Sequence, residues 1–205
     1  MNSPTVQIVD DDAAVRDALQ WLLQSRRVAS RTWGSADAFL DFASPKLCGC
    51  LLLDVRMPGM SGIELFDRLR MLKCRLPVIF LTGHGDVPMA VQALKDGAFD
   101  FIEKPYDDNA LVDKVLAAIE HDTRRSAKDG SLLLLQQRLA QLTQREQEVM
   151  RLILAGKLNK VIADELNIAM RTVEVHRSHI FEKMQVRSAV ELSQVLGVLG
   201  DAQDY

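Results

Sequence analysis

The sequence has few aromatic residues, few cysteines and no long apolar run, and each shortage narrows the class of protein. Aromatic residues make up 5% of the 205 residues, so aliphatic side chains must fill any core. The three cysteines, Cys48, Cys50 and Cys74, are an odd number, which argues against a disulfide framework and favours buried free thiols in a reducing cytoplasm. The longest purely aliphatic run, Leu132–Leu135, is far too short to span a bilayer, so we expect a cytoplasmic protein without membrane contact.

Strong charge of one sign is also missing. The formal net charge is -3, so any residues that bind nucleic acid must be concentrated locally. The segment Met1–Asp12 lacks a basic region and turns acidic at once, so we do not expect a signal peptide. Hydrophobic residues make up 48% of the chain, which is enough for a packed core.

Residues 1–121 alternate short apolar runs with amphipathic helical segments. The predicted strands are Val6–Val9, a weaker run near Val28–Trp33, Leu51–Leu53, Val78–Leu81 and Phe99–Ile102. Repeated strand–helix alternation predicts an α/β domain in which helices cover both faces of a five-stranded, parallel, doubly wound sheet. In such folds the functional groups lie at the carboxyl ends of the strands.

The remainder of the chain reads as helical. We expect a largely helical linker over residues 122–141, in which Asp129-Gly130 either breaks the helix or lies within it. Residues 142–205 predict an all-α domain of four short helices, with capping boxes at Thr143–Glu146 and Ser188–Glu191. Helices near 158–166 and 170–184 with tight turns fit a helix-turn-helix domain.

Acidic residues follow two of the predicted strands. Asp10 and Asp11 come after the first strand, and Asp54 comes after Leu51–Leu53. Neighbouring parallel strands would bring these carboxylates together, where they repel one another, and Mg²⁺ would relieve that repulsion.

Thr82 and Lys104 follow two further strands. A hydroxyl, an ammonium and a metal ion around one carboxylate make a phosphoryl-transfer site with Asp54 as the nucleophile. Taken singly, each residue has an ordinary explanation as a turn, cap or surface residue. Taken together at four strand ends, they favour the functional interpretation.

The motifs around these residues resemble the receiver domain of response regulators, which has a flavodoxin-like fold. The similarity spans about Thr5–Ile119 and rests on Val9-Asp10-Asp11, Leu53 to Gly62, Leu81-Thr82-Gly83 and Lys104-Pro105. The resemblance implies that Asp54 is the phosphoacceptor. It also implies that Mg²⁺ is bound by Asp11, Asp54 and the backbone carbonyl of Arg56, with Asp10 acting through a water.

The same resemblance assigns a conformational switch. It makes Thr82 the switch hydroxyl, Phe101 the switch aromatic residue and Lys104 the phosphate-binding lysine, with a cis bond before Pro105. Phe101 departs from the commoner tyrosine, so it can swing inward but has no hydroxyl to hydrogen-bond.

The segment Gly83–Pro88 is similar to nitrogen-fixation regulators of the FixJ type, within the FixJ/NarL group. His84 in this segment is interpreted as a loop residue without a chemical role. Overall similarity suggests regulators of aromatic-hydrocarbon catabolism, such as styrene-pathway regulators, although no single residue carries that suggestion.

The C-terminal motifs resemble a LuxR-type helix-turn-helix over about Leu142–Val195. They are Leu142 to Glu146, Asn159 to Ala163 and Arg171 to Arg177. The third helix would bury Val173, Ile180, Phe181 and Met184. The resemblance assigns base reading to Glu174, Val175 and Ser178, and phosphate contacts to Lys160, Arg171, Thr172 and Arg177.

Two positions depart from the helix-turn-helix family. Ala169 stands where a capping Ser or Thr is usual, which costs about 1 kcal/mol. Glu174 is acidic where some relatives carry lysine, and it would repel phosphate. DNA affinity is therefore expected to depend on dimerisation.

The sequence thus predicts a phosphorylation-controlled transcription factor. A sensor histidine kinase would phosphorylate Asp54, and the faces near residues 86–95 and 107–120 would then form a homodimer that binds promoter DNA. Contact with RNA polymerase and activation of a catabolic operon are expected to follow.

Two alternatives stay open at this point. One is a Mg²⁺-dependent phosphatase, which would usually need a second acid where Arg56 stands. The other is a receiver that works without phosphate and holds DNA constitutively.

Overall fold

The computed structural model describes residues 3–83 and 87–200. Its residues group into two compact units, Met1–Ser126 and Ala127–Tyr205. His84, Gly85 and Asp86, which belong to the segment similar to FixJ-type regulators, lie outside the described residues.

The N-terminal unit is built on a five-stranded sheet with the order β2-β1-β3-β4-β5. All neighbouring strands are parallel. The strands are β1 Thr5–Val9, β2 Ser30–Trp33, β3 Gly49–Asp54, β4 Val78–Thr82 and β5 Asp100–Glu103. The helices are α1 Ala13–Ser25, α2 Ala36–Phe42, α3 Gly62–Met71, α4 Val87–Lys95 and α5 Asp108–Ala140. The predicted doubly wound fold is confirmed, with strand boundaries that differ by one or two residues.

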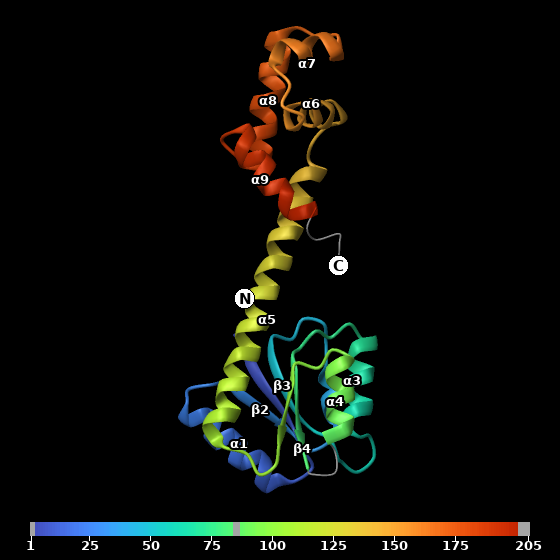
Figure 1. Ribbon diagram of the computed structural model, residues 1–205, viewed down its shortest axis with the longest axis vertical. Helices are drawn as coiled ribbons and strands as arrows, with labels where there is room; N and C mark the ends of the chain where they lie inside the picture. The colour runs from blue at the N-terminus through green and yellow to red at the C-terminus, as the bar shows by residue number, and fades with distance from the viewer. Residues whose placement is uncertain (1–2, 84–86, 201–205) are drawn as a thin grey trace. The chain divides into compact units, whose positions relative to one another are not determined.

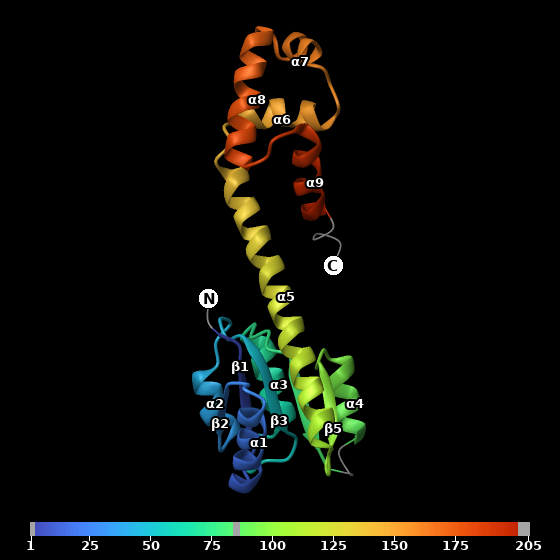
Figure 2. The same ribbon diagram turned by 90° about the vertical axis from the view of Figure 1, so that its left-hand side faces the viewer.

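Helices cover both faces of this sheet (Figures 1 and 2). One layer contains α1 and α5, whose buried Leu19, Leu23, Leu111 and Val115 pack with Leu52 of β3. The opposite layer contains α2, α3 and α4, which pack against the other side of the same strands. Because the central strand β3 is covered on both sides, all of its residues are buried.

Polar side chains cap helices of the receiver. The side chain of Asp12 accepts a hydrogen bond from the Ala14 N–H and caps α1, while Ser61 and Glu64 form a capping box at α3. Gly62 is required there, because a Cβ at this position would come within 2.1 Å of the Asp54 carbonyl oxygen. The first turn of α3 therefore lies against the end of β3.

No disulfide joins the three cysteines within the described part of the chain. Cys50 and Cys74 are buried, and Cys48 is half-buried. Burial, assisted by the charge of Asp122, raises the pKa of Cys50 to about 12. The Cys50 thiol therefore stays protonated and unreactive while β3 is folded.

A buried carboxylate fastens α5 to the beginning of β3. Asp122 accepts a hydrogen bond from the Gly49 N–H at 2.9 Å and one from the Arg125 guanidinium at 2.5 Å. Only 2% of Asp122 is exposed, so these two donors replace the water that its buried oxygens lack. The role of Asp122 was not predicted from the sequence.

The helix α5 continues for 33 residues and includes Asp129 and Gly130. Of the two alternatives for Asp129-Gly130, the structure shows the second: the dipeptide lies within the helix and does not break it. A helical glycine costs about 1 kcal/mol relative to alanine, which the strong helix formers Ala127, Lys128 and Leu132–Leu135 can offset.

The C-terminal unit contains the four predicted helices. They are α6 Gln144–Leu154, α7 Asn159–Leu166, α8 Met170–Met184 and α9 Ala189–Gly200. The Thr143–Glu146 capping box is confirmed. The second predicted box is only half right: the Glu191 N–H donates to Ser188 Oγ, but the Glu191 carboxylate accepts from Arg187 rather than from Ser188.

The core of this unit joins all four helices. Val173, Ile180 and Met184 of α8 are buried with Val149 of α6 and Ile162 of α7. Phe181 was predicted to be buried with them, but it is only half-buried because it packs at the margin of the core. Among residues 3–83 and 87–200, no helix combines the length and hydropathy needed to cross a bilayer.

Candidate functional site

The carboxyl end of the receiver sheet brings three predicted site residues into direct contact. Asp10 follows β1, Asp54 ends β3, and Lys104 follows β5. The Lys104 Nζ atom lies 2.6 Å from Asp54 Oδ1 and 3.1 Å from Asp10 Oδ2. One ammonium therefore bridges two carboxylates from neighbouring strands.

Each carboxylate is oriented by its own loop as well. The Asp12 N–H donates to Asp10 Oδ1 at 2.9 Å, and the Arg56 N–H donates to Asp54 Oδ2 at 2.8 Å. Asp10 is 1% exposed and Asp54 is 8% exposed. With one oxygen held by the loop and the other directed at Lys104, neither carboxylate is free to rotate.

Burial and neighbouring charge compete at Asp54. Burial raises the pKa of Asp54, the hydrogen bond and charge of Lys104 lower it, and Asp10 raises it again, so the net direction is upward. For Lys104, burial alone would lower the pKa, but the hydrogen bonds with Asp54 and Asp10 raise it. Lys104 therefore stays protonated, and further positive charge would stabilise the ionised form of Asp54.

The residues at this edge suit a hard divalent cation. Within the described ranges, no three His, Cys, Asp or Glu side chains are grouped so that they could hold a metal ion by themselves. Mg²⁺ does not require such a cage, because it takes one or two carboxylates and completes its shell with water and other oxygens. The oxygens of Asp10 and Asp54, with exposed Asp11 beside them, fit that preference.

Thr82 and Phe101 lie near the site on adjacent strands. Thr82 is fully buried, and its hydroxyl donates to the Ile102 carbonyl at 3.4 Å rather than to Asp54. Phe101 is half-buried and packs against the core on the α4 side of the sheet. In the described structure, the Thr82 hydroxyl therefore bonds to the neighbouring strand, and Phe101 packs in the core.

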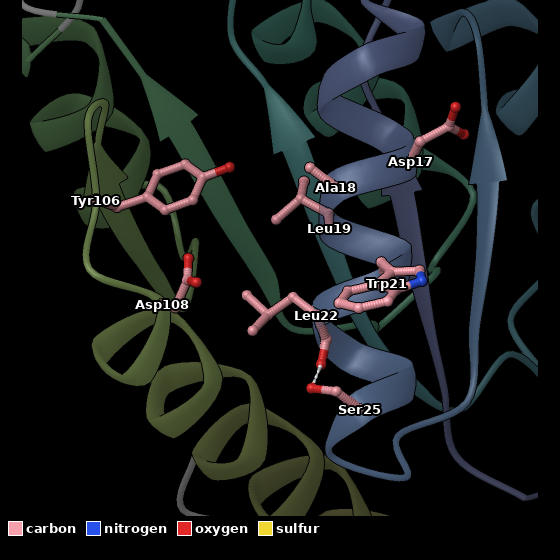
Figure 3. A pocket seen from close by; sticks show the side chains of 8 residues that line it. All are labelled: Asp17, Ala18, Leu19, Trp21, Leu22, Ser25, Tyr106 and Asp108. Atoms are coloured by element: carbon pink, nitrogen blue, oxygen red, sulfur yellow. Dashed lines mark hydrogen bonds between the residues drawn. The ribbon is translucent and has the colours of Figure 1, made fainter.

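A groove that was not predicted from the sequence lies between α1 and the segment that follows β5 (Figure 3). Its walls are Asp17, Ala18, Leu19, Trp21, Leu22 and Ser25 of α1, and Tyr106 and Asp108 after the cis Lys104–Pro105 bond. Trp21 is 77% exposed, which is unusual for so large an apolar side chain. The sequence feature that could have revealed this groove is Trp21 itself, because it interrupts the polar face of an amphipathic helix.

The helix α8 presents most of the residues predicted to contact DNA. Glu174, Val175 and Ser178 are exposed, as are Arg171 and Thr172. Lys160 is exposed on α7. Arg177 was expected to point outward, but it is half-buried because its guanidinium stacks over the Phe181 ring at 5.3 Å.

The predicted loss of a cap on α8 is present in the structure. Ala169 occupies the N-cap position, and no side chain of the described residues caps the helix there. Leu158 occupies the N-cap position of α7, and no side chain of the described residues caps that helix either. This second uncapped helix was not predicted from the sequence.

Glu146 is a further residue that the sequence analysis assigned only to a cap. It is 3% exposed, and its carboxylate accepts hydrogen bonds from the Thr143 N–H at 2.8 Å and from Lys183 Nζ at 2.7 Å. Burial alone would raise the pKa of Glu146, but the bonds from Lys183 and Thr143 together lower it. The cap of α6 therefore also holds the end of α8.

Comparison with known families agrees with this arrangement of two units. Residues 6–116 match the response regulator receiver domain, and residues 140–196 match the bacterial regulatory proteins of the LuxR family. The chain belongs to the response regulators with a LuxR-type DNA-binding domain, and it is therefore a two-component transcriptional regulator rather than an enzyme.

Individual relatives cover nearly the whole chain. The C4-dicarboxylate transport transcriptional regulatory protein DctR of Rhodobacter capsulatus is 51% identical over 193 residues, which are 93% of this chain and 98% of that protein. The transcriptional regulatory protein FixJ of Rhizobium meliloti is 44% identical and covers 94% of each chain. The solved structure of the response regulator StyR has a TM-score of 0.90 at 42% identity and covers 96% of this chain and 99% of its own.

Proposed function

We propose that the chain switches transcription when Asp54 accepts a phosphoryl group from a sensor histidine kinase. The observation that carries this proposal is the contact of Lys104 with both Asp54 and Asp10. A buried nucleophile beside a fixed ammonium is suited to a reaction in which negative charge gathers on phosphoryl oxygens.

In the proposed step, a carboxylate oxygen of Asp54 forms a bond to phosphorus as the phosphorus–nitrogen bond of the kinase phosphohistidine breaks. Lys104 neutralises charge on the transferring oxygens. A Mg²⁺ ion held by Asp54, Asp11 and the carbonyl of Arg56, with Asp10 acting through a water, would supply further positive charge there.

The groove beside the site is the proposed approach for the kinase. It includes Tyr106, two residues after Lys104, and exposed Trp21 of α1. A partner helix that covers Trp21 would place its phosphohistidine near Asp54. Contacts around a large exposed aromatic residue are a common source of binding energy.

Phosphorylation would then act through Thr82 and Phe101. The Thr82 hydroxyl would leave the Ile102 carbonyl and donate to the phosphoryl group, while Phe101 would move into the vacated space. This is a shift between two populated states, and it would favour a homodimer through the face of α4 and α5.

The C-terminal unit is the proposed DNA reader. Exposed Glu174, Val175 and Ser178 would contact base edges in the major groove. Lys160, Arg171, Thr172 and Arg177 would contact phosphates, which position the domain without specifying sequence. A dimer would read two half-sites of a promoter and activate transcription through contact with RNA polymerase.

The proposed domain division follows from these roles. We propose a receiver over residues 1–121, a largely helical linker over 122–141 and the DNA-binding domain over 142–205. For the regulated genes, the identity to DctR supports a promoter linked to C4-dicarboxylate transport, and the similarity to StyR supports one for aromatic catabolism. Selection of genomic DNA fragments by the phosphorylated protein tests both.

Asp54→Asn tests the central proposal. The variant should fold, retain basal DNA binding and lose signal-dependent activation of a reporter promoter. Incubation with acetyl phosphate should give a stable phosphoprotein with the unmodified chain and none with Asp54→Asn. An unchanged signal response in Asp54→Asn would refute the proposal and support a receiver that works without phosphate.

A further inference from the structure

A single arginine holds the acidic turn that follows β1. Arg16 lies in the first turns of α1, and its Nη1 atom donates to the Asp10 carbonyl at 2.7 Å and to the Asp11 carbonyl at 3.0 Å. One guanidinium nitrogen carries two hydrogens, so it can serve both carbonyls at once. Arg16 therefore fixes two successive peptide units.

These two bonds determine where the paired acids lie. Asp10 is additionally restrained by Asp12 and Lys104, which hold its carboxylate oxygens. Asp11 is exposed, and its backbone is restrained through the carbonyl that accepts from Arg16. Loss of the arginine would therefore loosen Asp11 more than Asp10.

The guanidinium binds main-chain oxygens and leaves the carboxylates available. An arginine that paired with the acids themselves would compete with a cation for the same oxygens. Here both donations go to main-chain carbonyls, so Arg16 orders the turn without occupying a side-chain oxygen.

The surroundings hold Arg16 in this position. Its side chain is half-buried, and a Cβ built at Gly34 would lie 3.7 Å from its guanidinium. The turn between β2 and α2 thus lies against one side of the guanidinium, and the acidic turn lies on another. A side chain confined in this way loses little further entropy when it donates its two bonds.

We propose that Arg16 is a positioning residue that presets the acidic turn for a divalent cation. The inference rests on the proposed function, in which the acidic site binds Mg²⁺ before Asp54 is phosphorylated. Outer-shell partners of this kind typically change metal affinity by about tenfold or more when removed.

The experiment is a calorimetric titration of the full-length, unphosphorylated protein with Mg²⁺ alone. Arg16→Gln should weaken Mg²⁺ binding about tenfold. Arg16→Lys, which keeps the charge but replaces the rigid planar guanidinium with a flexible ammonium, should fall between Arg16→Gln and the unmodified chain. Lys46→Gln removes the same charge from an exposed turn before β3 and should leave the affinity unchanged.

A second measurement separates positioning from folding. Phosphorylation by acetyl phosphate should be slower in Arg16→Gln at limiting Mg²⁺ and recover at saturating Mg²⁺, because the nucleophile is intact. Mg²⁺ affinities of Arg16→Gln and Arg16→Lys within twofold of the unmodified chain would overturn the inference. If the unmodified chain itself neither bound Mg²⁺ nor accepted a phosphoryl group, the proposed function would fail instead.

Discussion

The ion pair between Lys183 and Glu146 gives the sharpest stability prediction, because it joins α8 to the buried cap of α6. Lys183→Met keeps a long apolar side chain but leaves the Glu146 carboxylate with one charged donor fewer. Loss of one partner from a fully buried pair costs roughly 3–5 kcal/mol. Here the Lys183 side chain is 32% exposed and the Glu146 side chain is 4% exposed, so solvent replaces part of the loss and we expect about 2 kcal/mol.

Hydrogen exchange in the full-length protein measures this effect where it arises. A loss of about 2 kcal/mol should speed exchange of the α6 and α8 amides by about 30-fold. The matched control is Lys157→Met, whose partner Glu165 has a side chain that is 41% exposed. That substitution should cost less than about 0.5 kcal/mol. Equal effects of the two substitutions would refute the argument from burial.

The same pair predicts a pH dependence with a definite sign. The pKa of Glu146 is lowered in the folded protein, so its contribution to stability is present above the ordinary pKa. That contribution is lost as the pH falls through the lowered folded value. Lys183→Met should reduce the pH sensitivity of α6 and α8 protection in this acidic range, and an unchanged profile would contradict the assignment.

Three further predictions concern the groove and the DNA-binding unit. Trp21→Ala should slow phosphoryl transfer from the cognate kinase while leaving the rate with acetyl phosphate unchanged, and equal slowing in both assays would exclude a docking role. Ala169→Ser should stabilise the C-terminal unit by about 1 kcal/mol in thermal unfolding, because a hydroxyl at the N-cap can accept from a first-turn N–H of α8. Lys160→Ala should lower the slope of log affinity against log salt by about 0.9, the value for one phosphate contact, and an unchanged slope would place Lys160 off the DNA.

Much of the receiver site could be predicted because its residues follow from the fold. The carboxyl ends of parallel strands meet at one edge, so Asp10, Asp54 and Lys104 had to lie near one another once the strands were recognised. The boundaries of α8, and those of α7 to within one residue, followed from turn residues and from a regular apolar pattern.

The residues that were not predicted from the sequence bind main-chain atoms or side chains that are distant in the sequence, and a local residue pattern reveals neither kind of contact. Arg16 donates to two main-chain carbonyls, and Asp122 accepts from a main-chain amide, so no complementary side chain announces either contact. The cap at Glu146 was recognised from local spacing, but its partner Lys183 is 37 residues away. The half-burial of Arg177 likewise depends on how Phe181 packs, which periodicity alone does not reveal.

The buried thiols of the receiver have a practical consequence. Cys50 lies in the central strand with its pKa raised to about 12, so a thiol reagent can modify it only after that strand opens to solvent. Cys48 is half-buried and should react earlier, with smaller fluctuations near the beginning of the same strand. The rates of labelling at these two natural cysteines would therefore report how often the phosphoacceptor domain opens, without an engineered cysteine, and would reveal whether phosphorylation makes that opening rarer.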